Sequence, residues 1–349
     1  MASNEVHRPP VNSPESRRRR QEIQQKIHDE QKNKFSTALT FGWLAQFLSM
    51  PFTRNKVLMQ CYPEMTIRNK EVPFTGALSA YKHVFVREST FKHFRGLTAM
   101  TLFQVPTILT RQVSSFYFTR ENDSIPTALS SYARGFAVNV TCGLASALWN
   151  IFHIAQVKMM SDYKPEQLSI YEYKNTLTTI RRTRRLNASG AFLTGVLPLC
   201  VYNVVHFTTL FFFSGVFSLS GSDRIAPVTT TIVSALLATL IAHPFDTIRT
   251  RMQYRLHSQV TDAVPLYNGM LDCAKTIWRD EGMKGFMRGF SGMSVHFAVS
   301  LIVSAFASAS INNNRRKRLK QEYLMKAREA KAEQRRMALA ADKLSHVRS

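Results

Sequence analysis

The side chains most able to do chemistry are ionisable residues inside long apolar runs. Arg111, His206 and His296 stand in such runs, where an ionisable group marks a functional site by default. The arginine could bind an anion, and a histidine could bind a ligand or relay a proton. The plainer alternatives are an arginine that snorkels to a membrane surface and histidines that are satisfied in the core. No Gly-rich phosphate loop, nucleophile elbow or metal-ligand cluster occurs, so the sequence predicts no enzyme, no catalytic residue and no metal site.

A second set of polar residues recurs at fixed distances from two prolines. Pro51 and Pro244 each stand near the end of an apolar run, and each is followed by a glutamine at +9, a glycine at +25, a glutamate at +37 and Arg-Gly at +44 and +45. The residues at these offsets are Gln60, Gly76, Glu88, Arg95 and Gly96 in one copy and Gln253, Gly269, Glu281, Arg288 and Gly289 in the other. This recurrence indicates an internal repeat of about 100 residues, whose middle copy has Ile151 at the proline position.

Six runs with few or no charges must position these residues. They are Phe35–Thr53, Gly96–Thr119 with its one arginine, Gly135–Val157, Leu186–Ser222, Ile225–Phe245 and Gly289–Asn314. A helix needs about 20 apolar residues to cross a bilayer, and most of these runs are that long. Ser, Thr, Gly and Asn are interspersed, which favours closely packed membrane helices with one wetter face. The sequence thus predicts an all-α membrane protein, with a large soluble helical protein as the alternative.

The composition narrows the class of protein further. The 349-residue chain is 45% hydrophobic and carries a formal net charge of +23, which excludes an acidic or disordered chain. Its lysines and arginines lie at the ends of the apolar runs and in the two tails rather than in one stripe, so no nucleic-acid partner is expected. The cysteines are too far apart to predict a disulfide framework or a zinc site. They are Cys61, Cys142, Cys200 and Cys273.

The third copy of the repeat carries a family resemblance. It contains His243-Pro-Phe-Asp-Thr-Ile-Arg-Thr-Arg-Met-Gln253 and then Glu281-Gly-Met-Lys-Gly-Phe-Met-Arg-Gly289. These segments resemble the signature of the mitochondrial carrier family, P-x-[DE]-x-x-[KR]-x-[KR] with its later acidic-glycine and basic-glycine halves. The first copy keeps Lys56 but has Thr53 in place of the acid and Leu58 in place of the second base. The second copy keeps little beyond Lys158 and Gly195.

The resemblance implies a barrel of six tilted transmembrane helices in three pseudo-symmetric repeats, with a short amphipathic helix between the paired spans. It also implies a multi-pass protein of the mitochondrial inner membrane. The predicted divisions are a basic N-terminal extension (1–34), repeat 1 (35–122), a degenerate repeat 2 (123–220), the best-preserved repeat 3 (221–314) and a basic helical C-terminal extension (315–349). Proline kinks membrane helices, so Pro51 and Pro244 are expected to kink theirs, while Ile151 should leave the third helix straighter.

In the family, the acid of each odd-numbered helix pairs with a base of the next repeat, which forms a gate on the matrix side. Carried over, Asp246 pairs with Lys56, whereas Thr53 faces Gln156 and His153 faces Arg249, so that one ion pair of three remains. The gate residues that the resemblance implies are Asp246, Lys56, Arg249, Arg251, Lys158, Gln60 and Gln253. The family's second gate, at the far ends of the even-numbered helices, has no visible counterpart in the sequence.

The family's solute contacts fall on aromatic and polar residues of the even-numbered helices. The candidate cavity residues are Phe103, Arg111, Tyr202, Asn203, His296 and Phe297. These do not match the family's patterns for nucleotides, keto acids or amino acids, so the solute is left open.

Two functions fit these observations. Loss of the gates predicts an accessory subunit docked on a larger respiratory-chain complex through the two extensions. The alternative is an active carrier that exchanges a small anionic metabolite. Either function predicts contacts with anionic lipids such as cardiolipin, which attract juxtamembrane basic residues, and no other cofactor.

Overall fold

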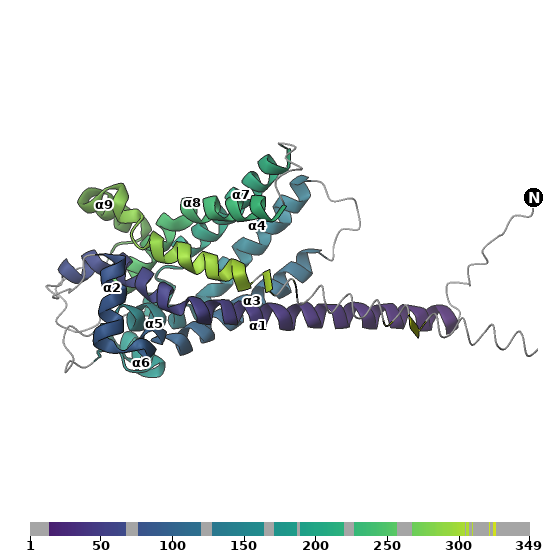
Figure 1. The fold of residues 1–349 in the computed structure, drawn as a ribbon, viewed down its shortest axis with the longest axis horizontal. Helices are drawn as coiled ribbons and strands as arrows, with labels where there is room; N and C mark the ends of the chain where they lie inside the picture. Colours follow the sequence, from purple (N-terminus) through teal and green to yellow (C-terminus); the bar gives the residue numbers. More distant parts are fainter. Residues whose placement is uncertain are drawn as a thin grey trace, which may run out of the picture. The chain divides into compact units, whose positions relative to one another are not determined.

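The computed structural model describes residues 14–67, 76–119, 128–163, 171–186, 189–219, 227–256 and 267–303, with a few positions beyond. It divides into two units, Met1–Leu301 and Ile302–Ser349, and the fold and site below belong to the first. Every secondary-structure element of the described residues is helical, which confirms the predicted all-α fold (Figure 1).

Six long helices form the framework. In chain order they are α1 (Pro14–Ile67), α3 (Leu97–Thr119), α4 (Ala128–Ala145) with its continuation α5 (Asn150–Ser161), α7 (Val196–Leu219), α8 (Pro227–Arg255) and residues 290–301. From α1 through α3, α4 and α7 to α8, each helix contacts the next, and α8 also contacts α1. Figure 1 shows α4, α7 and α8 lying side by side. The helices therefore follow one another around a closed bundle.

Most of these helices have the composition of membrane spans. The stretches long and apolar enough to cross a membrane are Leu129–Ser161, Val196–Val216, Ile232–Arg255 and Met283–Val303. The other two predicted spans lie in α1 and α3, whose described residues are more polar and do not reach that composition, as Gln104 of α3 illustrates. Large apolar side chains, including Leu148 and Phe212, are exposed, which suits a surface that faces lipid.

Short helices connect the paired long ones. They are α2 (Ala77–His83) with its π and 3₁₀ turns (Val84–Glu88 and Thr90–Phe94), α6 (Thr176–Leu186), and α9 (Met270–Glu281) with α10 (Met283–Phe286). In α9, Cys273 and Ile277 are buried while the charged residues Lys275, Arg279 and Asp280 are exposed. This amphipathic pattern agrees with the short helix that the family resemblance implies.

Two glycines bring residues 290–301 close to α1. A Cβ atom added at Gly289 would lie 2.7 Å from the carbonyl oxygen of Lys56, and one at Gly292 would lie 2.8 Å from that of Phe52. Gly289 also has a φ of +79°, which side chains other than glycine rarely adopt. The last helix is therefore held against the segment of α1 that carries Lys56.

The third long helix is less regular than predicted. Pro51 and Pro244 lie inside unbroken α1 and α8, whereas the helix that has Ile151 is interrupted by a 3₁₀ turn at Ser146–Trp149. Just after this turn, the Asn150 side chain donates to the carbonyl group of Phe192, in the 3₁₀ helix Ser189–Leu193, and to that of Thr194 before α7. A tighter turn thus interrupts this helix without a proline, and the expectation that Ile151 leaves it straighter stays a prediction.

The N-terminal extension continues the first span. Residues 14–34 belong to α1, so the predicted boundary after residue 34 falls inside a helix. At 1.5 Å per residue, this segment adds about 30 Å of helix. The predicted C-terminal extension, 315–349, lies almost entirely outside the described residues.

Candidate functional site

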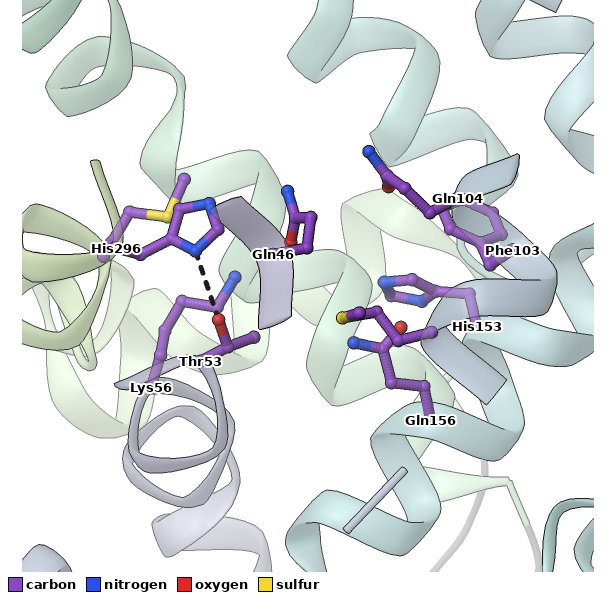
Figure 2. A pocket seen from close by; sticks show the side chains of 10 residues that line it. Gln46, Thr53, Lys56, Phe103, Gln104, His153, Gln156 and His296 are labelled. Carbon is purple, nitrogen blue, oxygen red and sulfur yellow. Dashed lines mark hydrogen bonds between the residues drawn. The ribbon is translucent and has the colours of Figure 1, made fainter. Parts of the chain in front are cut away.

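A polar cavity of about 120 Å³ lies among α1, α3, α5 and the last helix (Figure 2). Its lining contains three glutamine amides, two imidazoles, one hydroxyl and one ammonium group, with apolar groups between them. The lining residues are Gln46, Thr53, Lys56, Met100, Phe103, Gln104, His153, Gln156, Met293 and His296. Figure 2 shows Lys56, Thr53 and His296 on one side of the cavity and His153, Phe103 and Gln156 on the other. No carboxylate belongs to this lining.

An ion pair joins the cavity lining to α8. Lys56 Nζ donates to Asp246 Oδ2 over 2.9 Å, and Gln60 Nε2 donates to the same oxygen over 3.0 Å. The side chains of Lys56 and Asp246 are 12% and 15% exposed. Lys56 and Gln60 are four residues apart and so share one face of α1. This is the pair that the resemblance implies, and its function as a gate remains a prediction.

The two other predicted gate contacts are replaced by neutral hydrogen bonds. Thr53 Oγ1 lies 3.2 Å from His296 Nδ1 rather than against Gln156. His153 Nδ1 lies 2.6 Å from Gln253 Oε1, so it does not pair with Arg249. Because neither expected pair joins opposite charges, each side chain bonds to the nearest neutral partner.

Arg249 is buried without a carboxylate partner among the described residues. Its exposed fraction is 4%, its Nη2 makes one long bond of 3.4 Å to Asn150 Oδ1, and its guanidinium lies 5.3 Å from the centre of the Phe103 ring. Thr53, Lys56, His153, Gln156, Asp246 and Arg249 are called the gate layer below. In the gate layer, a single ion pair thus holds two repeats together.

A second charged layer lies farther along the odd-numbered helices. Arg54 is fully buried, and its Nη2 donates to Glu88 Oε2 over 2.8 Å and to the carbonyl of Asp162 over 2.9 Å. Its Nε also donates to the carbonyl of Met160. The guanidinium therefore joins the first repeat to the C-terminal end of α5.

Arg95 makes a similar connection. Its Nη2 donates to Asp162 Oδ2 over 2.9 Å and to the carbonyl of Tyr173 over 2.7 Å, and its Nε donates to the carbonyl of Met159. The Arg95 guanidinium lies 3.5 Å from the centre of the Tyr171 ring. Arg54 and Arg95, both from the first repeat, thus bind the segment at and just after the end of α5.

In the second and third repeats, a basic side chain likewise binds the end of the next odd-numbered helix. Lys158 Nζ donates to the carbonyl groups of Tyr254 and Leu256 at the end of α8. Arg255 Nε donates to Glu64 Oε2 near the end of α1 over 2.6 Å. Positive charge is favourable at a helix C-terminus, where carbonyl groups lack partners. Arg54, Arg95, Lys158 and Arg255, with the groups that accept from them, are called the end ring below.

The end ring shows a register change between the first and third repeats. In the third repeat, Arg251 stands seven residues after its proline and pairs with Glu281. In the first, Leu58 stands at that position, and Arg54, one helical turn earlier, pairs with Glu88. Positions four residues apart share one helix face, so either can present a base to the same glutamate. A search at fixed offsets missed Arg54, but a search for any base on that face would have found it.

Tyrosines complete the buried ion pairs. Burial, together with the adjacent Glu88 carboxylate, raises the pKa of Tyr171, and burial with Glu64 raises the pKa of Tyr267. Both phenols therefore stay protonated and donate to those carboxylates. Near Arg54, burial and then the guanidinium charge lower the pKa of His93 to about 4, so this histidine is neutral.

The predicted cavity residues divide into two groups. Phe103 and His296 belong to the lining, whereas Arg111, Tyr202, Asn203 and Phe297 do not. Arg111 is exposed, with its Nη2 3.4 Å from Asn139 Oδ1, and Tyr202 stacks on His206. Within the described ranges, no group of three potential ligands is placed to hold a metal ion.

The structure adds Gln46 and Gln104 to the cavity lining, which the sequence analysis did not name, and places the predicted gate residue Lys56 in the same lining. Gln46, Thr53, Lys56 and Gln60 are spaced seven, three and four residues apart, so they form a polar stripe along one face of α1. Three of them reach the cavity. The spacing could have been found in the sequence, but the offsets were counted forward from Pro51, and Gln46 precedes that proline. Gln104 was missed although it directly follows Phe103, which was predicted.

Comparisons with known proteins agree with this architecture. The sequence pattern described as mitochondrial carrier protein matches residues 224–313. ADP,ATP carrier protein 1 of Saccharomyces cerevisiae is 26% identical over 283 residues, which cover 74% of this chain and 87% of that protein. Mitoferrin of Dictyostelium discoideum is 25% identical over 251 residues, covering 65% of this chain and 77% of mitoferrin. The chain is thus similar in sequence to mitochondrial carriers, and the family's pattern matches its third repeat.

Other carriers match over a shorter length. The glutamate/glycine mitochondrial carrier of Schizosaccharomyces pombe is 28% identical over 173 residues, so the match spans about half of that protein (54%) and 47% of this chain. The segment matched by the carrier pattern contains Asp246, Arg249 and Arg251. Mitochondrial carriers are transporters, which agrees at the family level with the expectation that the chain is not an enzyme.

Proposed function

We propose that this chain is an active carrier that moves a small polar solute through the cavity beside Lys56. The observation that carries the proposal is that Lys56 both lines the polar cavity and forms the only ion pair of the gate layer. A solute in the cavity can therefore contact the bond that closes it. The similarity to carriers named for ADP and ATP, and for glutamate and glycine, supports a transport function without identifying the solute.

The energy of the gate layer suits reversible opening. Exposed ion pairs contribute about 0–1 kcal/mol, and partly desolvated pairs contribute more. With two of the three family pairs replaced by neutral contacts, the layer holds its closed form through Lys56, Asp246 and Gln60. Opening of the gate layer itself then requires one ion pair to break rather than three.

An accessory subunit of a larger complex is the second candidate. The end ring favours it, because Arg95–Asp162 and Arg255–Glu64 join different repeats and are largely buried. A carrier that opens at this end must rearrange those contacts, whereas a structural subunit keeps them. Partners bound through the extensions belong to this proposal. Anionic lipids such as cardiolipin, and the inner membrane as location, are proposed for both candidates, the location on family grounds.

Uptake into liposomes tests the carrier proposal. The purified chain is reconstituted with a mixture of labelled small carboxylates, amines and neutral polar solutes. Wild type should take up at least one of them. Gln104→Trp should abolish uptake because it fills the cavity, whereas Gln112→Trp, on the same helix but outside the lining, should preserve it.

The contrary result is equally clear. If a folded wild-type protein takes up none of these solutes and migrates with a larger complex from gently solubilised membranes, the carrier proposal is wrong and the accessory function is favoured.

A further inference from the structure

We propose that the outward face of α6 is a docking surface for an acidic segment of a partner protein. The surface consists of Leu177 and four exposed basic residues, and these five are called the basic stripe below. The basic residues are Lys174, Arg181, Arg184 and Arg185. The stripe belongs neither to the cavity lining nor to the gate layer, so this inference does not rest on the proposed transport function.

The basic stripe covers one face of α6. Leu177, Arg181 and Arg184 follow one another at intervals of four and three residues, which places them on the same face, and Arg185 lies beside them. The opposite face packs against the bundle through threonines, among them Thr179, which is 1% exposed. The helix therefore presents its charges outward along about two turns.

The helix that carries the stripe is fixed to the bundle beside α5 (Figure 1). Thr176 Oγ1 lies 2.5 Å from Thr98 Oγ1 of α3. Just before the helix, the backbone N–H of Tyr173 donates to Asp162 Oδ2 over 3.0 Å, and Arg95 Nη2 donates to the Tyr173 carbonyl over 2.7 Å. The surface is thus formed in advance, and a partner does not have to order it.

The charges of the stripe are not neutralised within the described residues. The segment from Tyr173 to Arg185 contains no aspartate or glutamate. Arg182, outside the stripe, pairs with Glu172 over 3.4 Å, but no carboxylate of the described part of the chain pairs with a cation of the stripe. Four positive charges are therefore available to a partner of opposite charge.

The short helices of the three repeats share part of this surface. Each repeat has an exposed leucine eighteen residues before the glycine that directly precedes its next long helix, and an exposed base fourteen residues before that glycine. The leucines are Leu78, Leu177 and Leu271, the bases are Lys82, Arg181 and Lys275, and the glycines are Gly96, Gly195 and Gly289.

The repeats differ eleven residues before the same glycine. The first and third repeats have the exposed aromatic residues Phe85 and Trp278 there, whereas the second has Arg184, followed by Arg185. Aromatic side chains such as tryptophan are enriched where a helix meets lipid headgroups. Because α6 has two arginines in place of that aromatic residue, its outward face suits a charged protein surface better than a lipid surface.

The side-chain chemistry of the stripe suits carboxylates. A guanidinium group presents its N–H donors as a planar fork that can bind a carboxylate through two hydrogen bonds. Arg181, Arg184 and Arg185 lie within about 6 Å along the helix axis, so acidic residues one turn apart on a partner can meet them together. Leu177, which is 66% exposed, adds an apolar contact at the start of the stripe.

The test measures binding of a labelled synthetic peptide to the full-length protein in phosphatidylcholine nanodiscs. The peptide forms a helix with glutamates three and four residues apart beside one leucine, and a control peptide has glutamine at each glutamate position. The glutamate peptide should bind wild type, and the glutamine peptide should bind about tenfold more weakly or not at all. Equal binding of the two peptides would overturn the inference.

A triple variant of α6 locates the binding site. Arg181→Gln, Arg184→Gln and Arg185→Gln together should weaken binding of the glutamate peptide about tenfold, the factor that corresponds to three exposed ion pairs of ordinary strength. The variant should unfold at the wild-type temperature, because all three side chains are exposed.

A second triple variant is the matched control. Lys275→Gln, Arg279→Gln and Lys284→Gln together remove the same number of exposed positive charges from the third repeat. This control should bind the peptide within about twofold of wild type. Equal losses in the two triple variants would mean that the peptide responds only to the overall charge of the protein, and they would overturn the inference.

The same measurement in nanodiscs that are half phosphatidylglycerol separates a protein partner from lipid. The difference in affinity between wild type and the α6 variant should persist there. If it disappears, anionic headgroups occupy the stripe and the inference is wrong. Solute uptake by liposomes that contain the α6 variant should equal that of wild type, so failure of this inference and failure of the transport proposal are seen in different measurements.

Discussion

The gate layer and the end ring use charged residues in opposite ways. Among the described residues, the gate layer retains one ion pair, which is partly exposed and borders a cavity. In the end ring, Arg54 and Glu88 have fully buried side chains, and bases of all three repeats bind the end of the next odd-numbered helix. Under the proposed transport function, stability and gating would be carried by separate layers. Ion pairs would then be few where a contact must break and numerous where repeats are joined.

The largest effect is expected at the centre of the end ring. Arg54→Ala removes the guanidinium from the buried Glu88 carboxylate and from two carbonyl groups of the next repeat. Breaking a buried ion pair by removing one partner costs about 3–5 kcal/mol, so the unfolding temperature in detergent should fall steeply. Arg279→Ala is the control, because Arg279 is exposed, and it should unfold at the wild-type temperature. A small shift for Arg54→Ala would contradict the assigned function of the ring.

A double substitution tests the register change between the first and third repeats. Arg54→Leu combined with Leu58→Arg moves the base to the position that Arg251 occupies in the third repeat. Since the two positions share one face of α1, the new arginine should reach Glu88 and restore much of the stability lost in Arg54→Leu alone. Unfolding temperatures of the two single variants and the double variant provide the measurement. Losses that simply add would show that the positions are not interchangeable.

A smaller effect is expected at the junction of the second and third repeats. Lys158→Met keeps an unbranched chain but removes the donor to the carbonyl groups of Tyr254 and Leu256. Buried polar groups that lose their partner cost about 1–3 kcal/mol. Denaturation should therefore show a loss smaller than that of Arg54→Ala. A loss as large as that of Arg54→Ala would mean that the junction of the second and third repeats contributes as much stability as the junction of the first and second.

The smallest effect on stability is expected in the gate layer. Lys56→Gln removes the ion pair, but Gln60 still donates to the Asp246 carboxylate and the new amide keeps a donor at position 56, so the expected loss is about 1 kcal/mol. Solute uptake should nevertheless stop, because the same side chain lines the cavity. The measurement is the unfolding temperature together with uptake by liposomes that contain the variant. Full uptake by Lys56→Gln would contradict its assigned function.

The sequence was sufficient for the fold because the third repeat preserves its signature and the six apolar runs are long. It also placed Asp246 against Lys56, since both stand at family positions. It did not identify Arg54, because this base lies four residues before the family position at Leu58, on the same face of α1. The hydrogen-bond partners of Thr53 and His153 could not be predicted from the sequence either, because a neutral polar side chain can bond to several kinds of partner. Which partner it contacts depends on how the helices pack rather than on offsets along the chain.

Cys61 offers the most direct test of a gate that opens when solute binds. It is fully buried on α1, between Gln60 of the gate contact and Glu64 of the end ring. In a variant that keeps only Cys61, alkylation by N-ethylmaleimide in reconstituted liposomes is measured with and without a solute that wild-type liposomes take up. The account predicts slow alkylation that this solute accelerates. If Cys61 remains unreactive in both conditions, while the half-buried Cys200 kept alone in a parallel variant is alkylated, this end of the protein does not open and the carrier account is wrong.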